Sequence, residues 1–186
     1  MANFKKLLMK IYFVLVFMIC LGAIPLPGQV FKSQEAALQE IFADADTVLR
    51  ETLFLEDAQV SAIQEKSKTA LSSAIIIYYL GLKNGRPLRY VFFEDPVVRS
   101  KKAVVMAAVS PAGTVERLEV LAFYEPQDYL PIPRWFALFK DRSLNDQLLP
   151  GKGIPAVTGA TLSVRAFTGM ARRALAIQEL IGKEGR

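Results

Sequence analysis

The chain has 186 residues, of which 52% are hydrophobic and 22% are charged, and its formal net charge is +5. These values are typical of a globular protein with one core, and they exclude a mostly disordered chain. Histidine is absent, and the only cysteine, Cys20, lies in the most apolar segment. This composition excludes a disulfide framework, a thiolate metal cage and an iron–sulfur cluster, so redox chemistry in this chain requires an organic cofactor.

Residues 1–31 are predicted to be a signal-anchor. Lys5, Lys6 and Lys10 precede an apolar run over residues 11–24. Because lysines stay on the cytoplasmic side, everything after this run is expected outside the cytoplasm. No convincing small-residue cleavage site precedes Gln29. The sequence therefore predicts an uncleaved, single-pass anchor in the inner membrane and a periplasmic C-terminal domain.

Residues 32–68 are predicted to be a helical lead-in to that domain. Ser33 is a plausible N-cap for a helix over residues 34–53, because apolar side chains there recur every three or four residues. A second short helix is predicted over residues 57–66, with Val60 and others on one side.

Residues 74–124 have the texture of four consecutive strands. Two runs rich in β-branched and aromatic residues, 74–82 and 88–93, are separated by Asn84-Gly85, a strong hairpin signal. The next two runs are separated by Pro111-Ala-Gly113 and are predicted to form a second hairpin, with strands over 102–110 and 115–124. The expected fold class is α+β, with an antiparallel sheet of four or more strands and flanking helices.

The last third of the chain combines an irregular segment with one helix. Residues 125–155 are rich in proline and aromatic residues and contain a short amphipathic stretch over 134–139. Long irregular segments of this kind often shape a site. A final amphipathic helix is predicted over 162–181 and is expected to end at Gly182.

The basic residues do not indicate a nucleic-acid partner. They are scattered along the chain without the interleaved aromatic residues of a single-strand binding groove. Arg172 and Arg173 are adjacent and give a weak hint of anion contact, but a solvated helix face is the more common explanation of such a pair.

The segment Thr158-Gly-Ala-Thr-Leu-Ser163 lies where the irregular region meets the final helix. A helix N-terminus offers unpaired N–H groups and a positive dipole end, which suit a phosphate. Gly159 and Ala160 allow close approach to the backbone, and the threonine hydroxyls supply an acceptor or an attachment oxygen. An ordinary helix cap is the alternative explanation of the same residues.

With this motif the sequence resembles the FMN-binding domain family. Members include flavin-bearing periplasmic subunits of Rnf-type complexes and sodium-pumping quinone reductases, and flavin domains of membrane regulators of nitrous oxide reduction. The resemblance extends over residues 69–186 and rests on these features: the motif Thr158–Ser163, Arg165-Ala-Phe, Arg172-Arg-Ala-Leu-Ala-Ile177, the strands from Ile75 to Tyr124, the pair Tyr124-Glu125, and Arg134-Trp135.

The resemblance implies a covalent flavin. In that family a flavin transferase joins FMN, through its phosphate, to the last threonine of the motif, which is Thr161 in this sequence. The remaining motif residues are implied to bind the cofactor: Thr158, Gly159, Ala160, Leu162 and Ser163. The implied function is that of an electron carrier rather than a stand-alone catalyst, with the transferase and membrane or periplasmic redox proteins as partners.

Two points stay open in this interpretation. Tyr124, Tyr129 and Trp135 are candidate neighbours of the flavin ring, but packing in the core explains each of them equally well. The family motif usually begins with aspartate three residues before the first Ser/Thr, and this sequence has Pro155 there. The alternatives are therefore an anchored binding or assembly module without covalent flavin, and a domain that binds FMN or another phosphate-bearing ligand noncovalently.

Overall fold

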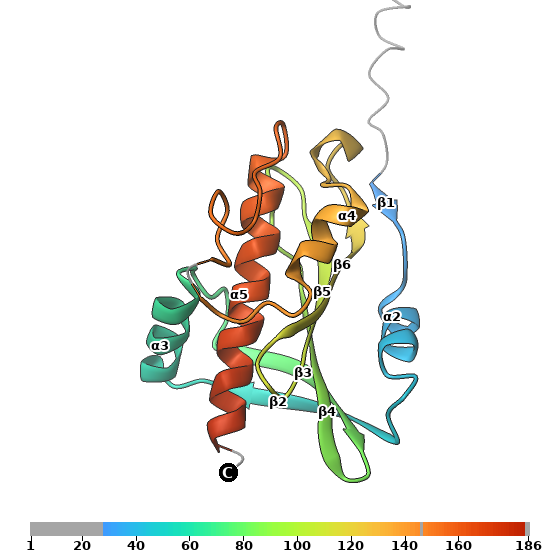
Figure 1. The fold of residues 1–186 in the computed structure, drawn as a ribbon, viewed down its shortest axis with the longest axis vertical. Helices are drawn as coiled ribbons and strands as arrows, with labels where there is room; N and C mark the ends of the chain where they lie inside the picture. The colour runs from blue at the N-terminus through green and yellow to red at the C-terminus, as the bar shows by residue number, and fades with distance from the viewer. Residues whose placement is uncertain (1–27, 146, 185–186) are drawn as a thin grey trace, which may run out of the picture.

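The computed structural model describes residues 28–145 and 147–184. These residues form a six-stranded antiparallel sheet with the order β1-β6-β5-β4-β3-β2, flanked by helices (Figure 1). The strands are β1 Gln29–Val30, β2 Thr47–Phe54, β3 Ile75–Lys83, β4 Arg86–Glu94, β5 Ala103–Val109 and β6 Val115–Phe123. The helices are α2 Gln34–Ile41, α3 Asp57–Ser67, α4 Pro133–Phe136 and α5 Thr161–Glu184, with 3-10 turns η1 Gln127–Tyr129 and η2 Ala137–Phe139. The α+β class predicted from the sequence is confirmed.

The predicted signal-anchor falls on residues 1–31, and most of it lies outside the described residues. Within the part of the chain that the structure describes, no helix has the length and apolar character needed to cross a membrane.

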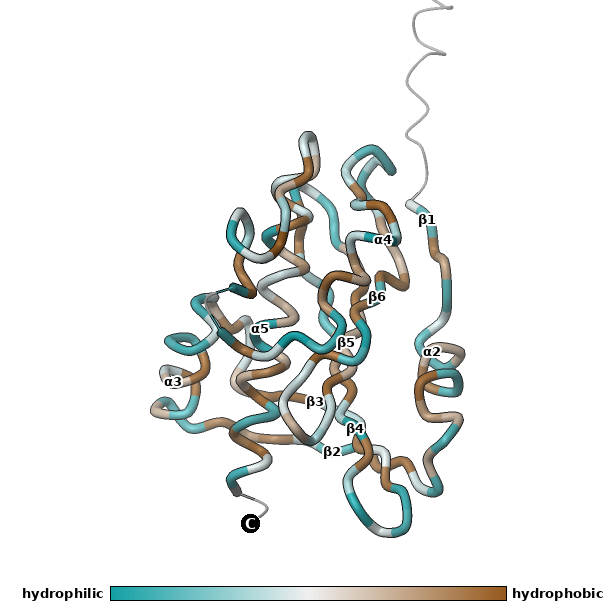
Figure 2. The backbone as a smooth tube through the Cα atoms, viewed as in Figure 1, coloured by the Kyte–Doolittle hydropathy of each residue, from teal (hydrophilic) through white to brown (hydrophobic). Residues whose placement is uncertain are grey.

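The two faces of the sheet are covered by different helices. Helix α5, with α3 beside it, lies on one face, and α2 lies on the other (Figure 1). Alternate residues of a strand serve the two faces: in β5, Val105 and Ala107 join the core under α5, whereas Met106 and Ala108 join the smaller core under α2. Strand β5 accordingly consists of apolar residues alone, while the turn between β3 and β4 is hydrophilic (Figure 2).

Both predicted hairpins are present. Strands β3 and β4 are joined by Asn84 and Gly85, whose φ angles of 51° and 71° are those of a two-residue turn that matches the twist of the strands. Strands β5 and β6 are joined around Gly113, which has a φ of 77°. The tip is closed by the Ser110 and Thr114 hydroxyls, which lie 2.8 Å apart.

The helix predicted over residues 34–53 is wrong in its second half. Helix α2 begins after Ser33, whose hydroxyl accepts from the Ala36 N–H, but it ends at Ile41. Residues 47–54 form β2, which pairs with β3 along its whole length. A short apolar periodicity does not separate helix from strand, and here the pairing with β3 decides. The sheet thus contains strands from both sides of the boundary predicted at residue 69.

Helix α5 is longer than predicted. It continues through Gly182 to Glu184, so the expected end at Gly182 is wrong. Gly182 is not among the glycines with positive φ, and it therefore adds a helical residue instead of ending the helix. The predicted apolar stripe is otherwise buried, with Phe167, Met170 and Ala171 fully covered by the sheet and its loops.

Arg172 and Arg173 do not lie on a solvated helix face. Arg172 is 2% exposed and donates to four backbone carbonyls: those of Ser67 (2.6 Å), Lys66 (3.0 Å), Asn145 (2.6 Å) and Leu148 (3.0 Å). Two of these carbonyls belong to the last turn of α3, where they have no partner within the helix and where a cation is favoured. Arg173 forms an ion pair with Glu94, the last residue of β4.

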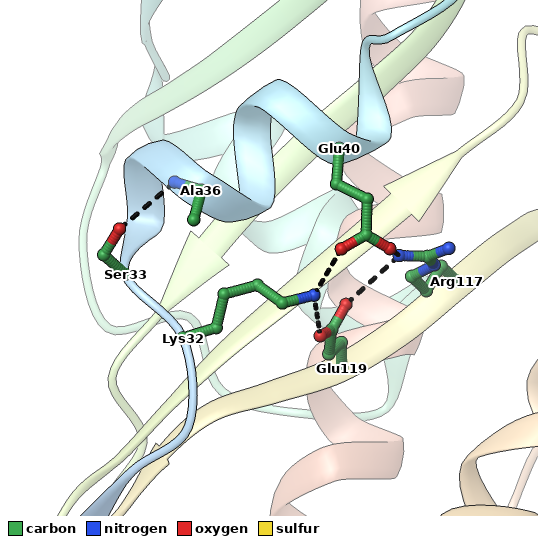
Figure 3. Close-up of polar contacts among 6 residues, drawn as sticks. All are labelled: Lys32, Ser33, Ala36, Glu40, Arg117 and Glu119. Carbon is green, nitrogen blue, oxygen red and sulfur yellow. Dashed lines mark hydrogen bonds and ion pairs between the residues drawn. The ribbon is translucent and has the colours of Figure 1, made fainter.

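Helix α2 is held against the sheet by a cluster of charges (Figure 3). The Lys32 ammonium lies 2.6 Å from both Glu40 and Glu119, and Arg117 contacts the same two carboxylates. Hydrogen bonds from Lys32, and then from Arg117, lower the pKa of Glu40 to about 2. The cluster ties the start of the described chain to β6.

Candidate functional site

The motif Thr158–Ser163 lies at the predicted junction of loop and helix. Thr161 is the first residue of α5 and is exposed, and the first turn of the helix carries no acidic residue. The N–H groups of this turn therefore keep a positive dipole end that no side-chain carboxylate of the turn neutralises. A hydroxyl at this position is accessible and close to donors that favour an anion.

The two residues before Thr161 shape the approach to it. Gly159 has a φ of 82°, a conformation that other residues adopt only with strain. No atom lies within 4 Å of where a Cβ would stand at Gly159, so the backbone conformation and not crowding favours glycine there. Ala160 is 1% exposed, and its N–H donates to the Val157 carbonyl at 3.0 Å. The loop is thus held in place at the buried Ala160, while the space beside Gly159 is open.

A pocket of about 200 Å³ opens beside Thr161. Three segments far apart in the sequence line it: Val98 and Arg99, then Tyr129, then residues 159–163. Ser163 joins two of them, because its hydroxyl donates to the Tyr129 carbonyl. The motif threonine, one arginine and one phenol therefore meet at the start of α5.

Arg99 and Tyr129 are in direct contact across this pocket. The Arg99 Nη1 donates to the Tyr129 hydroxyl at 2.8 Å, and the guanidinium carbon lies 5.3 Å from the centre of the ring. Such stacking combines a cation–π contact with a hydrogen bond. The sequence analysis missed Arg99, since the segment between the two hairpins contains no motif and its place at the site depends on tertiary packing.

A buried carboxylate fixes the turn that carries Arg99. The turn spans residues 98–101, and its Val98 N–H donates to the Lys101 carbonyl at 3.0 Å. The carboxylate of Glu125, 5% exposed, accepts from the backbone N–H groups of Ser100 and Lys101 and from the Ser100 hydroxyl. These hydrogen bonds, above all the one from the Ser100 N–H, lower the pKa of Glu125. Glu125 does not line the pocket, and its effect on Arg99 passes through the turn.

The three candidate ring neighbours occupy different environments. Tyr129 lines the pocket. Trp135 is 4% exposed, packs on Phe136 and Phe139 with ring centroids 5.1 and 5.0 Å away, and donates its indole N–H to the Pro155 carbonyl at 3.0 Å. Core packing therefore explains Trp135. Tyr124 is exposed and lies against Gly28, away from the pocket.

The other motif residues surround Thr161 unequally. Gly159, Ala160, Leu162 and Ser163 line the pocket, whereas Thr158 is exposed and outside its lining. Leu162, the second residue of α5, is 46% exposed. Pro155, at the position of the usual motif aspartate, is exposed on the loop that leads to the site.

A larger cavity lies elsewhere and lacks these features. It measures about 550 Å³ and is lined by β6 and by the segment from Leu130 to Lys140. Its charged lining includes Glu40, Arg117 and Glu119, which are already joined in ion pairs. No residue of Thr158–Ser163 lines it, so the smaller pocket is the site that the motif marks.

Comparison with known proteins agrees with the sequence analysis. Residues 100–176 match the family model of the FMN-binding domain, which confirms the resemblance drawn from the motif and supports FMN as the cofactor. A crystal structure of NqrC from Shewanella oneidensis is 18% identical, over 76% of this chain and 82% of that chain, with a TM-score of 0.47. No curated protein matches the chain.

Proposed function

From the match of residues 100–176 to the FMN-binding domain, we propose that this protein is a membrane-tethered, extracytoplasmic electron-transfer flavoprotein with FMN esterified to Thr161. One observation carries the proposal: Thr161 is the first residue of α5 and is exposed, and the pocket beside it is lined by a positively charged side chain, that of Arg99. A flavin transferase would join the phosphate of FMN to the Thr161 hydroxyl, as the resemblance implies. The donor would be an activated flavin nucleotide: its phosphoanhydride bond breaks as the bond from phosphorus to the Thr161 oxygen forms, the nucleotide part leaves, and the hydroxyl proton passes to solvent.

The residues at this pocket fit the phosphate end of FMN. The unpaired N–H groups of the first turn of α5 and the Arg99 guanidinium are donors that favour an anion. The space beside Gly159 is open, because no atom lies within 4 Å of where its Cβ would stand. This donor set is one for a phosphate and not for a metal ion, because it offers N–H groups and hydroxyls without a carboxylate.

The fused rings of FMN would lie mostly outside the pocket. Its volume of about 200 Å³ is below the range of roughly 300–1,000 Å³ that encloses most small-molecule ligands. The exposed Leu162 and the Tyr129 ring, at the rim, offer apolar surface to one side of the rings. When bound, FMN supplies one- or two-electron transfer, and the chain binds and orients it where another protein can approach.

The tether would assist this exchange. A domain held at the membrane meets membrane redox proteins at a raised effective concentration, so electrons can pass without tight complexes. The partners in this proposal are the flavin transferase and a membrane or periplasmic redox protein on each side of the electron path.

Pro155 favours a second candidate, an anchored module without covalent flavin. The position of the usual carboxylate is occupied by an exposed proline whose carbonyl accepts the Trp135 indole N–H. If the transferase requires that carboxylate, Thr161 would stay unmodified although the pocket keeps its shape.

Co-expression of the full chain with a flavin transferase tests the two candidates. We expect flavin fluorescence on a denaturing gel and an intact mass raised by one FMN unit. Thr161→Val, which keeps the shape of the side chain but removes the hydroxyl, should abolish both signals. Thr161→Ser is the matched control and should keep them, because its hydroxyl stands at the same place. An unmodified wild-type chain would favour the second candidate.

A further inference from the structure

We propose that Arg99 is the residue that holds the phosphate group of FMN at the start of α5. This inference rests on the proposed function, because it assumes that the pocket beside Thr161 receives the flavin. It adds a positioning residue that lies outside the motif and about sixty residues before it along the chain, at position 99 against 158–163.

Arg99 is the one positively charged residue among those that line the pocket. No carboxylate lies within ion-pair distance of it in the part of the chain that the structure describes. Other arginines do form ion pairs with carboxylates: Arg89 pairs with Asp44 and Glu116, and Arg173 pairs with Glu94. The charge at the pocket is thus left without an anion, next to the helix end that favours one.

The partner that Arg99 does have is a neutral one. Its Nη1 donates to the Tyr129 hydroxyl, and its guanidinium lies over the Tyr129 ring. A guanidinium forms stronger, often paired hydrogen bonds with a phosphate than with a phenol. An entering phosphate can therefore take the donors that Tyr129 holds, while the ring still supports the guanidinium from one side.

The backbone of Arg99 is fixed more firmly than its exposed side chain suggests. Glu125 accepts the N–H groups of Ser100 and Lys101, which follow Arg99 in the same turn. Val98, which precedes it, is buried at 7% exposure. A long side chain on a fixed turn can reorient toward a ligand with little change in the backbone.

The size of the pocket decides which part of FMN faces Arg99. A space of about 200 Å³ that also contains Thr161 accommodates a phosphate and part of the ribityl chain but is too small for three fused rings. The arginine and the start of α5 share this space, so they meet the phosphate, while the rings remain at the rim.

A titration that separates phosphate from ring tests the inference. The full chain, purified in detergent from cells without a flavin transferase, is titrated with FMN and with riboflavin, which lacks the phosphate, and quenching of flavin fluorescence gives the two affinities. We expect the wild type to prefer FMN by about tenfold or more, as a charge-assisted contact implies. Arg99→Ala should abolish the preference, and Arg99→Lys should retain part of it.

Two further variants make the titration specific. Arg165→Ala removes the same charge from an exposed residue of α5 that does not line the pocket, so it should keep the preference for FMN. Tyr129→Phe removes the hydroxyl that engages Arg99 but keeps the ring, and it should raise the preference for FMN, because the Arg99 donors are then free for the phosphate. A thermal melt of each variant checks that the fold is intact.

The flavinylated protein gives an independent readout. In protein loaded at Thr161, we expect Arg99→Ala to lower the steady-state fluorescence anisotropy of the flavin, because the phosphate is no longer held from both sides. The inference is overturned if Arg99→Ala keeps the wild-type preference for FMN, if the wild type binds FMN and riboflavin equally, or if loaded Arg99→Ala holds its flavin as rigidly as the wild type. An unmodified Thr161 would contradict covalent attachment alone, since the titration does not require it.

Discussion

The start and the middle of helix α5 use arginine in opposite ways. Toward the middle of the helix, Arg172 is buried and its donors are taken by backbone carbonyls of α3 and by those of Asn145 and Leu148. At the start of the helix, Arg99 approaches from a turn, and among the described residues the side-chain partner of its guanidinium is the neutral phenol of Tyr129. The donors of Arg172, which joins several elements of the fold, are thus all near backbone acceptors. Arg99, beside the exposed Thr161, keeps donors that a ligand can use.

This difference separates stability from binding along one helix. A buried guanidinium with satisfied donors fixes the position of α3 against α5, whereas one with spare donors can accept a ligand. The same contrast holds for exposure: Phe167 and Met170 are fully buried, and Thr161 and Leu162 are exposed. Substitutions at the start and in the middle of the helix are expected to affect different measurements.

The largest loss of stability is expected for Arg172→Met. The methionine fills similar space but leaves the carbonyls of Ser67, Asn145 and Leu148 buried without their donor. A buried carbonyl that loses its donor costs about 1–3 kcal/mol, and the carbonyl of Lys66 loses its donor as well. The free energy of unfolding, measured by urea titration, checks this value.

Arg99→Ala is the matched comparison for that substitution. Its side chain is exposed, so its effect on unfolding should stay within about 0.5 kcal/mol, although the preference for FMN is lost. Equal losses of stability for the two variants would contradict the division between a structural and a binding arginine.

Glu125→Ala is expected to affect both stability and binding. It removes the carboxylate that accepts the N–H groups of Ser100 and Lys101, and hydrogen bonds to a charged group contribute about 1.5–3 kcal/mol. Because the turn carries Arg99, the affinity for FMN should also fall, while that for riboflavin should change less. Paired urea and FMN titrations measure the two effects.

The pH dependence of this contribution has a definite sign. The pKa of Glu125 is lowered in the folded protein by the backbone N–H groups that it accepts. A depressed carboxyl pKa stabilises the fold above the pKa of the unfolded chain, and this contribution is lost as the pH falls through the folded value. Glu125→Gln should therefore show a smaller loss of stability on acidification than the wild type; an identical acid profile would contradict this role.

Gly159→Ala should have a moderate effect. The φ of 82° at this residue costs a residue with a Cβ roughly 1–2 kcal/mol, and no neighbouring atom obstructs the added methyl group. We expect a lower melting temperature and a shifted start of α5, with weaker attachment of flavin at Thr161. Gly151→Ala is a useful control, because it has a φ of 77° and similarly open surroundings but lies outside the site.

The sequence predicted local structure well where turn chemistry and side-chain periodicity agree. Asn84-Gly85 marks one hairpin, Pro111-Ala-Gly113 another, and the apolar stripe of α5 follows the helical period. It failed over residues 47–54, where pairing with a strand more than twenty residues away decides the conformation. Periodicity within the segment contains no information about that partner.

For the site, too, the sequence predicted the features that depend on local signals and not those that depend on long-range packing. The position of Thr161 at a helix start follows from the local motif, and the structure places it there. Arg99 and the turn that Glu125 holds could not be found, since they reach the motif only through the packing of β5, β6 and the η1 turn. The solvated helix face predicted for Arg172 and Arg173 was wrong for the same reason. Their partners are distant in the sequence and lie in α3, at Asn145 and Leu148, and in β4.

The smallest effect is expected at the opposite face of the sheet, where Glu40 links Lys32 and Arg117. Hydrogen bonds from these cations lower the pKa of Glu40 to about 2 from an ordinary value of 4.5. The ion pairs are therefore complete at neutral pH and weaken as the pH falls from about 4.5 toward 2. Hydrogen exchange should show α2 opening in this range before the strands under α5. Glu40→Gln should lower the protection of α2 against exchange at neutral pH and make its further loss on acidification smaller, because only Glu119 is then left to titrate in the cluster. Simultaneous opening of α2 and α5 would show instead that the two faces of the sheet unfold as one unit.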